Sequence, residues 1–316
     1  MAGRILIIRG GAIGDFILTL PAIRLLRQTF PDAYIEVLGY RHITTLAKGI
    51  YVDATRSIEY SAMAGFFNPK SELDSELCAY FSGFQQIISY LYDPDGFFEG
   101  NLRRAGVTNL VSGTPILHED FHASIQLAEP LKRLGLYLTS EDLPAPLTPA
   151  DTESAEAGKL LQAISSPRLA IHPGSGGRRK NWPAEKWTKW ITRFTDTHPA
   201  WNLLILGGES DQEALQTLRK HPHSSRLHFL ENKDLPVLAA VLHQCQGYMG
   251  HDSGISHLAA AAGCPCVLLF GPTKPEVWGP LGKQVCIIKS PTESMADISP
   301  EEVTSAVDSF IVSRIS

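Results

Sequence analysis

Residues 249–258 read Met-Gly-His-Asp-Ser-Gly-Ile-Ser-His-Leu; an alanine run and Gly263 follow, and residues 267–273 read Val-Leu-Leu-Phe-Gly-Pro-Thr. This order of residue types predicts a strand, a polar turn, a short helix, a second strand and a second turn. Asp252 and Ser253 are residue types that cap helix starts, and Gly263 is a residue type that ends helices. The stretch therefore predicts an α/β unit in which a helix begins at a polar turn.

The start of this predicted helix is suited to binding an anion. The unpaired N–H groups of its first turn and the positive end of its dipole would face whatever lies above the turn, and nucleotide phosphates suit that position. His257 falls in the first helical turn, close enough to point at the same place. The segment alone leaves a second interpretation open, namely an ordinary capped helix that carries a surface histidine.

The beginning of the chain repeats this pattern. Residues 4–8 are an apolar run of strand length, and residues 9–15 read Arg-Gly-Gly-Ala-Ile-Gly-Asp before an amphipathic stretch. A strand that runs into a Gly-rich turn and a helix is typical of the start of a doubly wound α/β domain. A dinucleotide fingerprint would need glycine at position 9, where this chain has arginine, so only the Gly11-x-x-Gly14 half is present.

Asp15 lies at the C-terminal edge of this first predicted strand. A carboxylate would repel a phosphate, so we do not expect this turn to hold one. Open α/β sheets place their chemistry at this edge, which makes Asp15 a candidate catalytic group. The alternative is a first-turn acid that only stabilises the helix dipole, by ~0.3–1 kcal/mol.

Composition and charge restrict the class of protein. The 316 residues are enough for about two domains, and 44% hydrophobic with 19% charged residues is ordinary for a globular α/β protein. The longest apolar runs fall short of the ~20 residues of a membrane span, and the N-terminal run is too short for a signal peptide, so we expect a cytoplasmic protein. The net charge of −5 argues against a general nucleic-acid binder.

The pattern of strands and helices predicts two α/β domains joined by a proline-rich segment at 143–149. We expect a first domain at 1–150, a second at 151–298, and a C-terminal helix at 299–316. The predicted strands are 4–8, 34–38, 86–91 and 107–111 in the first domain, and 168–172, 202–206, 226–229, 247–249 and 267–270 in the second. The predicted helices include 125–136, ending at Gly135, and 184–197, 209–220, 234–244 and 300–312.

A second anion-binding candidate is the loop at 172–183, which reads His-Pro-Gly-Ser-Gly-Gly-Arg-Arg-Lys-Asn-Trp-Pro. A diphosphate leaving group needs its charge neutralised, and Lys or Arg side chains with helix N-termini can do that without a metal. The alternative is a flexible loop with solvated cations. Glu209 follows another strand, where a carboxylate could accept hydrogen bonds from a ribose diol, although an acidic helix start looks the same.

Two further features do not indicate a metal or a disulfide framework. The five cysteines are scattered and odd in number, so we predict reduced and mostly buried thiols. Asp93-Pro94-Asp95 has the DxD pattern that holds a metal in some sugar transferases. Its central proline and the following Gly96 favour a plain turn, and we expect no metal there.

Five blocks of the sequence together resemble glycosyltransferase family 9, the bacterial ADP-heptose:lipopolysaccharide heptosyltransferases. The resemblance runs from residue 4 to about 283 in the family's order. The blocks are Gly14-Asp15; His172-Pro173-Gly174-Ser175 with Lys180 and Trp182-Pro183; Gly207-Gly208-Glu209; Asp252-Ser253-Gly254-x-x-His257-Leu258-Ala259-Ala260; and Phe270-Gly271-Pro272-Thr273 with Trp278-Gly279-Pro280. The resemblance implies the GT-B architecture, with two Rossmann-like domains facing across a cleft and the C-terminal helix packing back on the first domain.

The resemblance also implies a role for individual residues. Asp15 matches the general base of the family. The implied donor diphosphate contacts are Ser175, Lys180, Asp252, Ser253, Gly254 and His257; the implied ribose or base contacts are Glu209 and Leu235; and the acceptor-side candidates are Gly11, Gly14, Arg41, Asp93, Arg103 and Arg104.

The expected function is therefore inverting, metal-independent sugar transfer from an ADP-sugar, with ADP-heptose as the expected donor. The expected acceptor is a lipopolysaccharide-core, lipid-linked or related saccharide, with peripheral contact at the cytoplasmic face of the inner membrane and no nucleic-acid partner. The first half offers few basic residues for an anionic acceptor beyond Arg41, His42, Arg103 and Arg104. The alternatives are a nucleotide-sugar epimerase or hydrolase on the same fold, and a non-catalytic nucleotide-sugar-binding protein.

Overall fold

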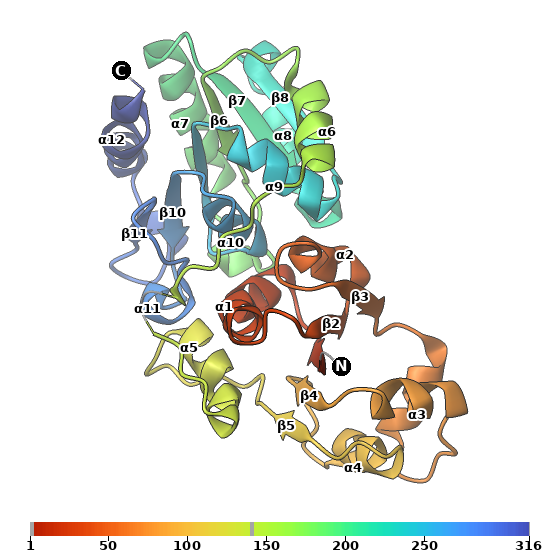
Figure 1. Ribbon diagram of the computed structural model, residues 1–316. Coiled ribbons are helices and arrows are strands. Elements are labelled where there is room, and N and C mark those ends of the chain that lie inside the picture. The colour runs from red at the N-terminus through yellow and green to blue at the C-terminus, as the bar shows by residue number, and fades with distance from the viewer. Residues whose placement is uncertain (1–2, 140–141, 316) are drawn as a thin grey trace. The chain divides into compact units, whose positions relative to one another are not determined.

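The structure is a computed structural model that describes residues 3–139 and 142–315, and it divides into two compact units between Ala145 and Pro146 (Figure 1). We call them unit 1 and unit 2. The division falls slightly before the predicted boundary at residue 150. The reason is that the backbone N–H of Leu147 already donates to the carbonyl of Ala261, at 2.8 Å, within unit 2.

Unit 1 is built on one parallel sheet. Its strands are β1 (Arg4–Arg9), β2 (Tyr34–Gly39), β3 (Ala54–Ser57), β4 (Gln86–Ser89) and β5 (Leu110–Ser112), in the order β3-β2-β1-β4-β5. The predicted strands at 4–8, 34–38 and 86–91 are confirmed, whereas β5 begins later than predicted. The sequence pattern missed β3, because its residues Ala-Thr-Arg-Ser are only half-buried and mostly polar.

Each strand of unit 1 is followed by a helix. They are α1 (Ile13–Thr29), α2 (Arg41–Thr44), α3 (Ser75–Ser82), α4 (Phe97–Arg104) and α5 (Ala123–Ala128), with 3-10 turns at Thr45–Ala47, Ser61–Phe67 and Glu129–Leu134. The predicted helix at 125–136 thus changes to 3-10 geometry after Ala128, where Pro130 lacks the N–H that an α-helix needs. It ends at Gly135, whose φ of 75° is in the left-handed region.

Unit 2 is built on a larger parallel sheet. Its strands are β6 (Arg168–Ile171), β7 (Asn202–Gly207), β8 (Leu227–Glu231), β9 (Gly247–His251), β10 (Cys266–Phe270) and β11 (Val285–Lys289), in the order β11-β10-β9-β6-β7-β8. Counted from β6, this is the strand order 3-2-1-4-5-6 of a doubly wound nucleotide-binding sheet. The five strands predicted for this half are all present, and β11 is an additional edge strand.

Unit 2 contains seven α-helices among its described residues. They are α6 (Asp151–Leu161), α7 (Ala184–Thr197), α8 (Gln212–Arg219), α9 (Leu235–His243), α10 (Gly254–Ala261), α11 (Pro275–Trp278) and α12 (Pro300–Phe310), with 3-10 turns that include Arg178–Lys180 and Glu209–Asp211. α7 has the predicted bounds, and α10 is the helix predicted after Asp252-Ser253. The indoles of Trp182 and Trp187 pack edge to face in the hydrophobic core of unit 2, with ring centroids 5.3 Å apart.

The C-terminal helix buries its apolar face within unit 2. Val303, Val307 and Ile311 are fully buried and belong to the core of unit 2. α12 packs against α7, β10 and β11, beside α7 in Figure 1. The amphipathic pattern predicts a helix with one apolar face, but the sequence does not specify which surface that face covers.

The five cysteines are free thiols, as the sequence predicts. Burial raises the pKa of the Cys245 thiol to about 12 and that of Cys264 well above its usual value, so both stay protonated. Within the described ranges 3–139 and 142–315, no helix has the length and apolar character needed to cross a membrane.

Candidate functional site

In unit 2 the strand order reverses between β6 and β9, which are neighbours in the sheet. Doubly wound sheets bind their ligands beside the carboxyl ends of the strands at such a reversal. β9 ends with His251, and His172 directly follows β6. Both imidazoles are buried, with 0% and 5% of their surface exposed, so they belong to the framework of the site.

His251 attaches the loop at 172–183 to the end of β9. Its Nε2 accepts the backbone N–H of Trp182 at 3.0 Å, so Nδ1 carries the proton and faces the carbonyl of Gly174 at 3.3 Å. Burial lowers the pKa of His251 to about 3. The imidazole is therefore neutral at physiological pH and acts as a fixed hydrogen-bonding link.

His172 forms a second buried link, between β6 and the start of α10. Its Nε2 lies 3.2 Å from Asp211 Oδ2, and its Nδ1 lies 3.4 Å from Ser253 Oγ. Burial alone would raise the pKa of Asp211, but hydrogen bonds from His172 and from the Gly208 N–H lower it below its usual value. Gly174 must be glycine here, since a Cβ would lie 1.7 Å from Asp211 Oδ1.

The start of α10 presents backbone donors at this same place. Ser253 is the N-cap, and its Oγ accepts the N–H of Ser256 at 3.3 Å. The N–H groups of Gly254 and Ile255 come first in the helix and have no partner within it by helical geometry. His257 lies one residue beyond Ser256 and is 5% exposed. The arrangement can bind an anion at the positive end of α10.

Lys180 and Asp252 form an ion pair beside this helix start, with Lys180 Nζ 2.7 Å from Asp252 Oδ2. The Lys180 side chain is 34% exposed, and the Asp252 side chain is 9% exposed. A carboxylate would repel a diphosphate directly, so Asp252 is better placed to hold Lys180 than to touch the ligand. Arg178 in the same loop is 94% exposed and lies 3.6 Å from Glu213.

The other predicted donor contacts are Ser175, Glu209 and Leu235. Ser175 Oγ lies 2.6 Å from Asn181 Oδ1, within the loop. Glu209 is exposed and follows β7, the strand beside β6. Leu235 is buried at the first position of α9, after β8. Ser175 and Glu209 therefore share the carboxyl edge with His172, while Leu235 follows the strand at the end of the sheet.

In unit 1 the corresponding reversal lies between β1 and β4, where Asp15 sits in the first turn of α1. Asp15 Oδ2 accepts the backbone N–H of Ala12 at 2.8 Å, and the side chain is 41% exposed. Gly11 has a φ of 97°, and a Cβ there would lie 2.8 Å from Asp15 Oδ2. Gly14 is the second residue of α1. The turn therefore holds a carboxylate open to solvent at the carboxyl edge of the sheet.

Arg9 is a neighbour of Asp15 that we did not predict. It ends β1 and is 5% exposed; its guanidinium donates to the Asp15 carbonyl at 3.3 Å and lies 3.9 Å from the Asp15 carboxylate. It also lies over the ring of Tyr90, 5.9 Å from the centroid. Burial lowers the pKa of Arg9 from its usual value. The sequence signal that could have revealed it is an arginine directly after the apolar run 5–8.

The acceptor-side candidates separate into two groups. Arg41 is exposed in α2, directly after β2, so it shares the carboxyl edge with Asp15. Arg103 and Arg104 end α4, which runs from that edge to the opposite one, and they bond within unit 1 to Glu99 and to Asn101. The structure therefore does not bring Arg103 and Arg104 together with Asp15.

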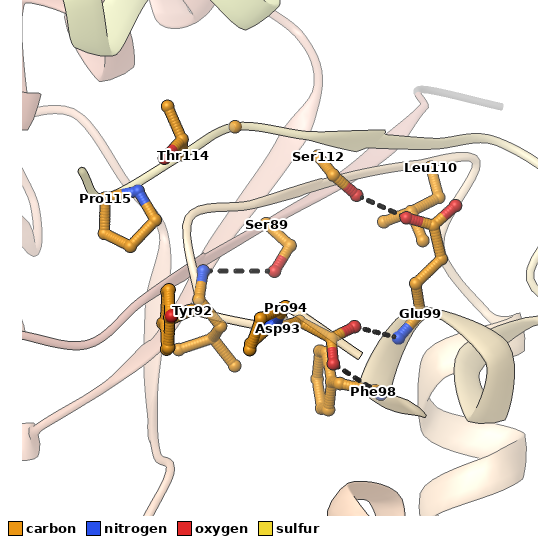
Figure 2. Close-up of a pocket in the computed structure, with 12 residues that line it drawn as sticks. Ser89, Tyr92, Asp93, Pro94, Phe98, Glu99, Leu110, Ser112, Thr114 and Pro115 are labelled. Atoms are coloured by element: carbon orange, nitrogen blue, oxygen red, sulfur yellow. Dashed lines mark hydrogen bonds between the residues drawn. The ribbon is translucent and has the colours of Figure 1, made fainter. Parts of the chain in front are cut away.

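Asp93 caps α4, accepting the N–H groups of Phe98 and Glu99 at 3.1 and 2.9 Å. It lines a pocket of about 190 Å³ at the ends of β4 and β5, shown in Figure 2. Across residues 3–139 and 142–315, no group of three His, Cys, Asp or Glu side chains is arranged to hold a metal ion. The DxD segment is a helix cap, in keeping with its turn composition.

These two sheets and their sites define a class of protein with two Rossmann-like domains, the predicted fold class. The family description "Glycosyltransferase family 9 (heptosyltransferase)" matches residues 123–307, more than half of the chain. The protein therefore belongs to glycosyltransferase family 9. The matched range covers most of unit 2 and only the end of unit 1, so Asp15 lies outside it.

Individual relatives agree with this assignment. Lipopolysaccharide heptosyltransferase 2 of Escherichia coli K12 is 24% identical over 204 residues, which are 56% of this chain and 58% of that protein. A family 9 glycosyl transferase from Veillonella parvula has the same fold, with a TM-score of 0.81, 17% identity and coverage of 98% and 97%. E. coli ADP-heptose lps heptosyltransferase II has a TM-score of 0.76, 19% identity and coverage of 99% and 100%. The chain matches 42% to 58% of the length of the first curated relatives.

Proposed function

We propose that this protein is an inverting, metal-independent glycosyltransferase that moves heptose from ADP-heptose to a lipopolysaccharide-core or related saccharide. Unit 2 would bind the donor, and unit 1 would bind the acceptor. The names of the relatives, a lipopolysaccharide heptosyltransferase and an ADP-heptose lps heptosyltransferase, support this choice of donor and acceptor. A cytoplasmic location with peripheral contact at the inner membrane follows from the same proposal.

The observation that carries the donor assignment is the preformed anion site at the start of α10. Backbone N–H groups, the helix dipole and Lys180 converge there, and the buried links through His172 and His251 hold the surrounding loop in place. Donors fixed before the reaction stabilise charge on a leaving group without reorganisation. The ADP diphosphate would displace part of the Asp252 contact with Lys180 as it binds.

Asp15 supplies the proposed general base. It would take the proton of the acceptor hydroxyl as that oxygen attacks the anomeric carbon, while the anomeric bond to the diphosphate breaks and ADP leaves with the bonding electrons. Attack opposite to the leaving group inverts the anomeric centre. The partial exposure of Asp15 and its fixed contact with Ala12 suit a base that meets a substrate hydroxyl.

Calorimetry with ADP, GDP and UDP, followed by assays with ADP-heptose, tests this function. We expect ADP to bind most tightly and ADP-heptose to be consumed only when a saccharide acceptor is present. Preferential binding of GDP or UDP would mean that the donor is wrong. Consumption of ADP-heptose without an acceptor would instead identify the hydrolase or epimerase alternative, and binding without turnover would identify a binding protein.

A further inference from the structure

The pocket in Figure 2 lies at the carboxyl ends of β4 and β5, in unit 1. Ser89 ends β4 and pairs in register with Ile8 of β1, so the pocket shares the sheet edge with Asp15. Leu91 lines the pocket and packs over the Gly-rich turn, because a Cβ at Gly10 would lie 3.4 Å from its Cδ2. The pocket is therefore next to the loop that carries the proposed base.

The polar atoms of this pocket are mainly acceptors. Glu99 Oε2 accepts the hydroxyl of Ser112 at 2.8 Å, and Asp93 accepts two backbone N–H groups. A carboxylate has about four acceptor positions, so each of the two can accept further hydrogen bonds. The hydroxyls of Ser89 and Thr114 also line the pocket. A ligand that fits these groups must be rich in hydrogen-bond donors.

The rest of the lining is rigid and apolar or aromatic. Pro94, Pro115 and Phe98 form its walls, and the Tyr92 side chain beside them is 62% exposed (Figure 2). An exposed aromatic ring next to hydroxyl-binding groups suits the apolar face and polar edge of a sugar ring. The volume of about 190 Å³ is below the ~300–1,000 Å³ of pockets for drug-sized ligands, so the pocket suits a single small ring.

The charges of the lining residues restrict the kind of sugar that the pocket can bind. The described lining residues contain two carboxylates, Asp93 and Glu99, and no Lys, Arg or His. The ion pair of Glu99 with Arg103, at 3.2 Å, offsets one of these charges, so a phosphate or carboxylate on the ligand would still meet the like charge of Asp93. We propose that this pocket binds a hydroxyl-rich sugar ring of the acceptor that carries no anionic group, which rests on the transferase function proposed above.

Ligand-observed NMR on the full-length protein tests this inference. The probes are methyl glucoside as the neutral ligand, its 6-phosphate, and the 2-amino-2-deoxy glycoside. We expect saturable binding of the neutral glycoside and binding of the phosphate weaker by about tenfold or more. Tyr92→Ala and Glu99→Gln should each weaken binding of the neutral glycoside by about fivefold to tenfold. Glu99→Gln keeps an oxygen that can accept the Ser112 hydroxyl.

Matched controls are Tyr137→Ala and Glu76→Gln, exposed residues of unit 1 outside the pocket lining, which should leave binding unchanged. Equal or tighter binding of the phosphate, or no effect of the pocket variants, would overturn the inference, whereas amino-sugar binding at least as tight as that of the neutral glycoside would support it. ADP titration of the same samples separates the two proposals. ADP binding and sugar transfer without glycoside binding in the pocket would refute only the pocket, whereas failure to bind any nucleotide would refute the transferase function.

Discussion

Units 1 and 2 use the same strand order around β1 and β6, yet the carboxyl ends of these strands carry opposite chemistry. In unit 2 the reversal carries two buried imidazoles, a lysine and the open start of α10. In unit 1 it carries a half-exposed carboxylate held by a buried arginine. The two strand reversals are equivalent positions in the fold. Their side chains make the reversal of unit 2 suited to binding an anion and the reversal of unit 1 suited to accepting a proton.

The two units also differ in their aromatic residues. All five tryptophans lie in unit 2, where Trp182, Trp187 and Trp190 are fully buried. Among the described residues, the exposed aromatic side chains lie in unit 1: Phe30, Tyr40, Tyr60, Phe67, Tyr92, Phe97, Phe121 and Tyr137. The family match covers mainly unit 2. Unit 2, the proposed donor side, therefore accounts for most of the family match, and we propose that unit 1 selects the acceptor.

The largest expected effect comes from removing the carboxylate of unit 1. Asp15→Asn keeps an oxygen that can accept the Ala12 N–H, so the turn should stay intact. Turnover should fall by ~10²–10⁴, the usual range for losing a general base, with ADP affinity unchanged. Initial rates of transfer and ADP calorimetry measure the two quantities.

Asp32→Asn is the matched control, because Asp32 is an exposed acid of unit 1 away from the sheet reversal. It should retain wild-type turnover. If Asp15→Asn retains turnover within threefold of wild type, Asp15 is not the general base, and unit 1 does not supply the proton acceptor.

The next largest effect comes from Lys180, beside the start of α10, and from His257, within that helix. Lys180→Ala and His257→Ala should each weaken ADP binding by ~1.5–3 kcal/mol and AMP binding by less. Lys180→Ala also leaves the Asp252 carboxylate facing the diphosphate, so Lys180→Ala/Asp252→Asn should bind ADP more tightly than Lys180→Ala alone. Calorimetry on the single and double variants measures this coupling.

Arg178→Ala provides the control within the same loop. Its side chain is 94% exposed and faces Glu213, so ADP affinity should change little. Wild-type ADP affinity in Lys180→Ala would show that the helix start binds the diphosphate without this lysine.

A smaller effect concerns stability in acid. Burial lowers the pKa of His251 from 6.5 to about 3, so the unfolded chain binds a proton that the folded protein excludes. From about pH 6.5 downward, this group should reduce the free energy of unfolding by up to ~1.4 kcal/mol per pH unit. Above pH 6.5 it should have no effect. Tryptophan fluorescence reports the unfolding of unit 2 in denaturant titrations at pH 7, 6 and 5.

Two variants test whether His251 causes this pH dependence of the free energy of unfolding. His221 and His228 also have a pKa lowered by burial, so part of the slope should persist in His251→Asn. His118→Asn, at an exposed position of unit 1, should retain the full wild-type slope. An unchanged slope in His251→Asn would show that His251 is not held neutral in the folded protein.

The smallest expected effect is that of a chelator. Because Lys180 and the start of α10 can neutralise the leaving group, transfer should persist in excess EDTA. The same assay with added Mn²⁺ or Mg²⁺ checks the converse. Activity lost with EDTA and restored by either ion would place a metal in the reaction and require a new role for Asp93 and Asp95.

The sequence predicted the elements that have a strong periodic pattern. α7 has its predicted bounds because its amphipathic pattern begins directly after Pro183. α10 was located from Asp252, Ser253 and Gly263, since cap residues act locally. The same local logic placed Asp15 at a sheet edge, because a Gly-rich turn directly follows a buried strand. Local patterns therefore predict the elements with strong periodicity and the sheet edge at which Asp15 lies, but not the polar strand β3 or the edge strand β11.

Contacts between distant residues could not be predicted in this way. Asp211 and His172 are 39 positions apart, and only the neighbouring strands β6 and β7 bring their loops together. The Lys180 contact with Asp252 likewise depends on the pairing of β6 with β9. The packing of α12 in unit 2 also depends on tertiary contacts, since an apolar helix face fits many surfaces.

The central claim is that the protein transfers a sugar with inversion from an ADP-sugar held by unit 2. NMR of a reaction that contains ADP-heptose and a saccharide acceptor tests it most directly, because the anomeric coupling and shift of the product identify its configuration. The account predicts a glycoside with the anomeric configuration opposite to that of the donor, formed together with ADP. A glycoside with retained configuration, or free heptose as the only product, would contradict it.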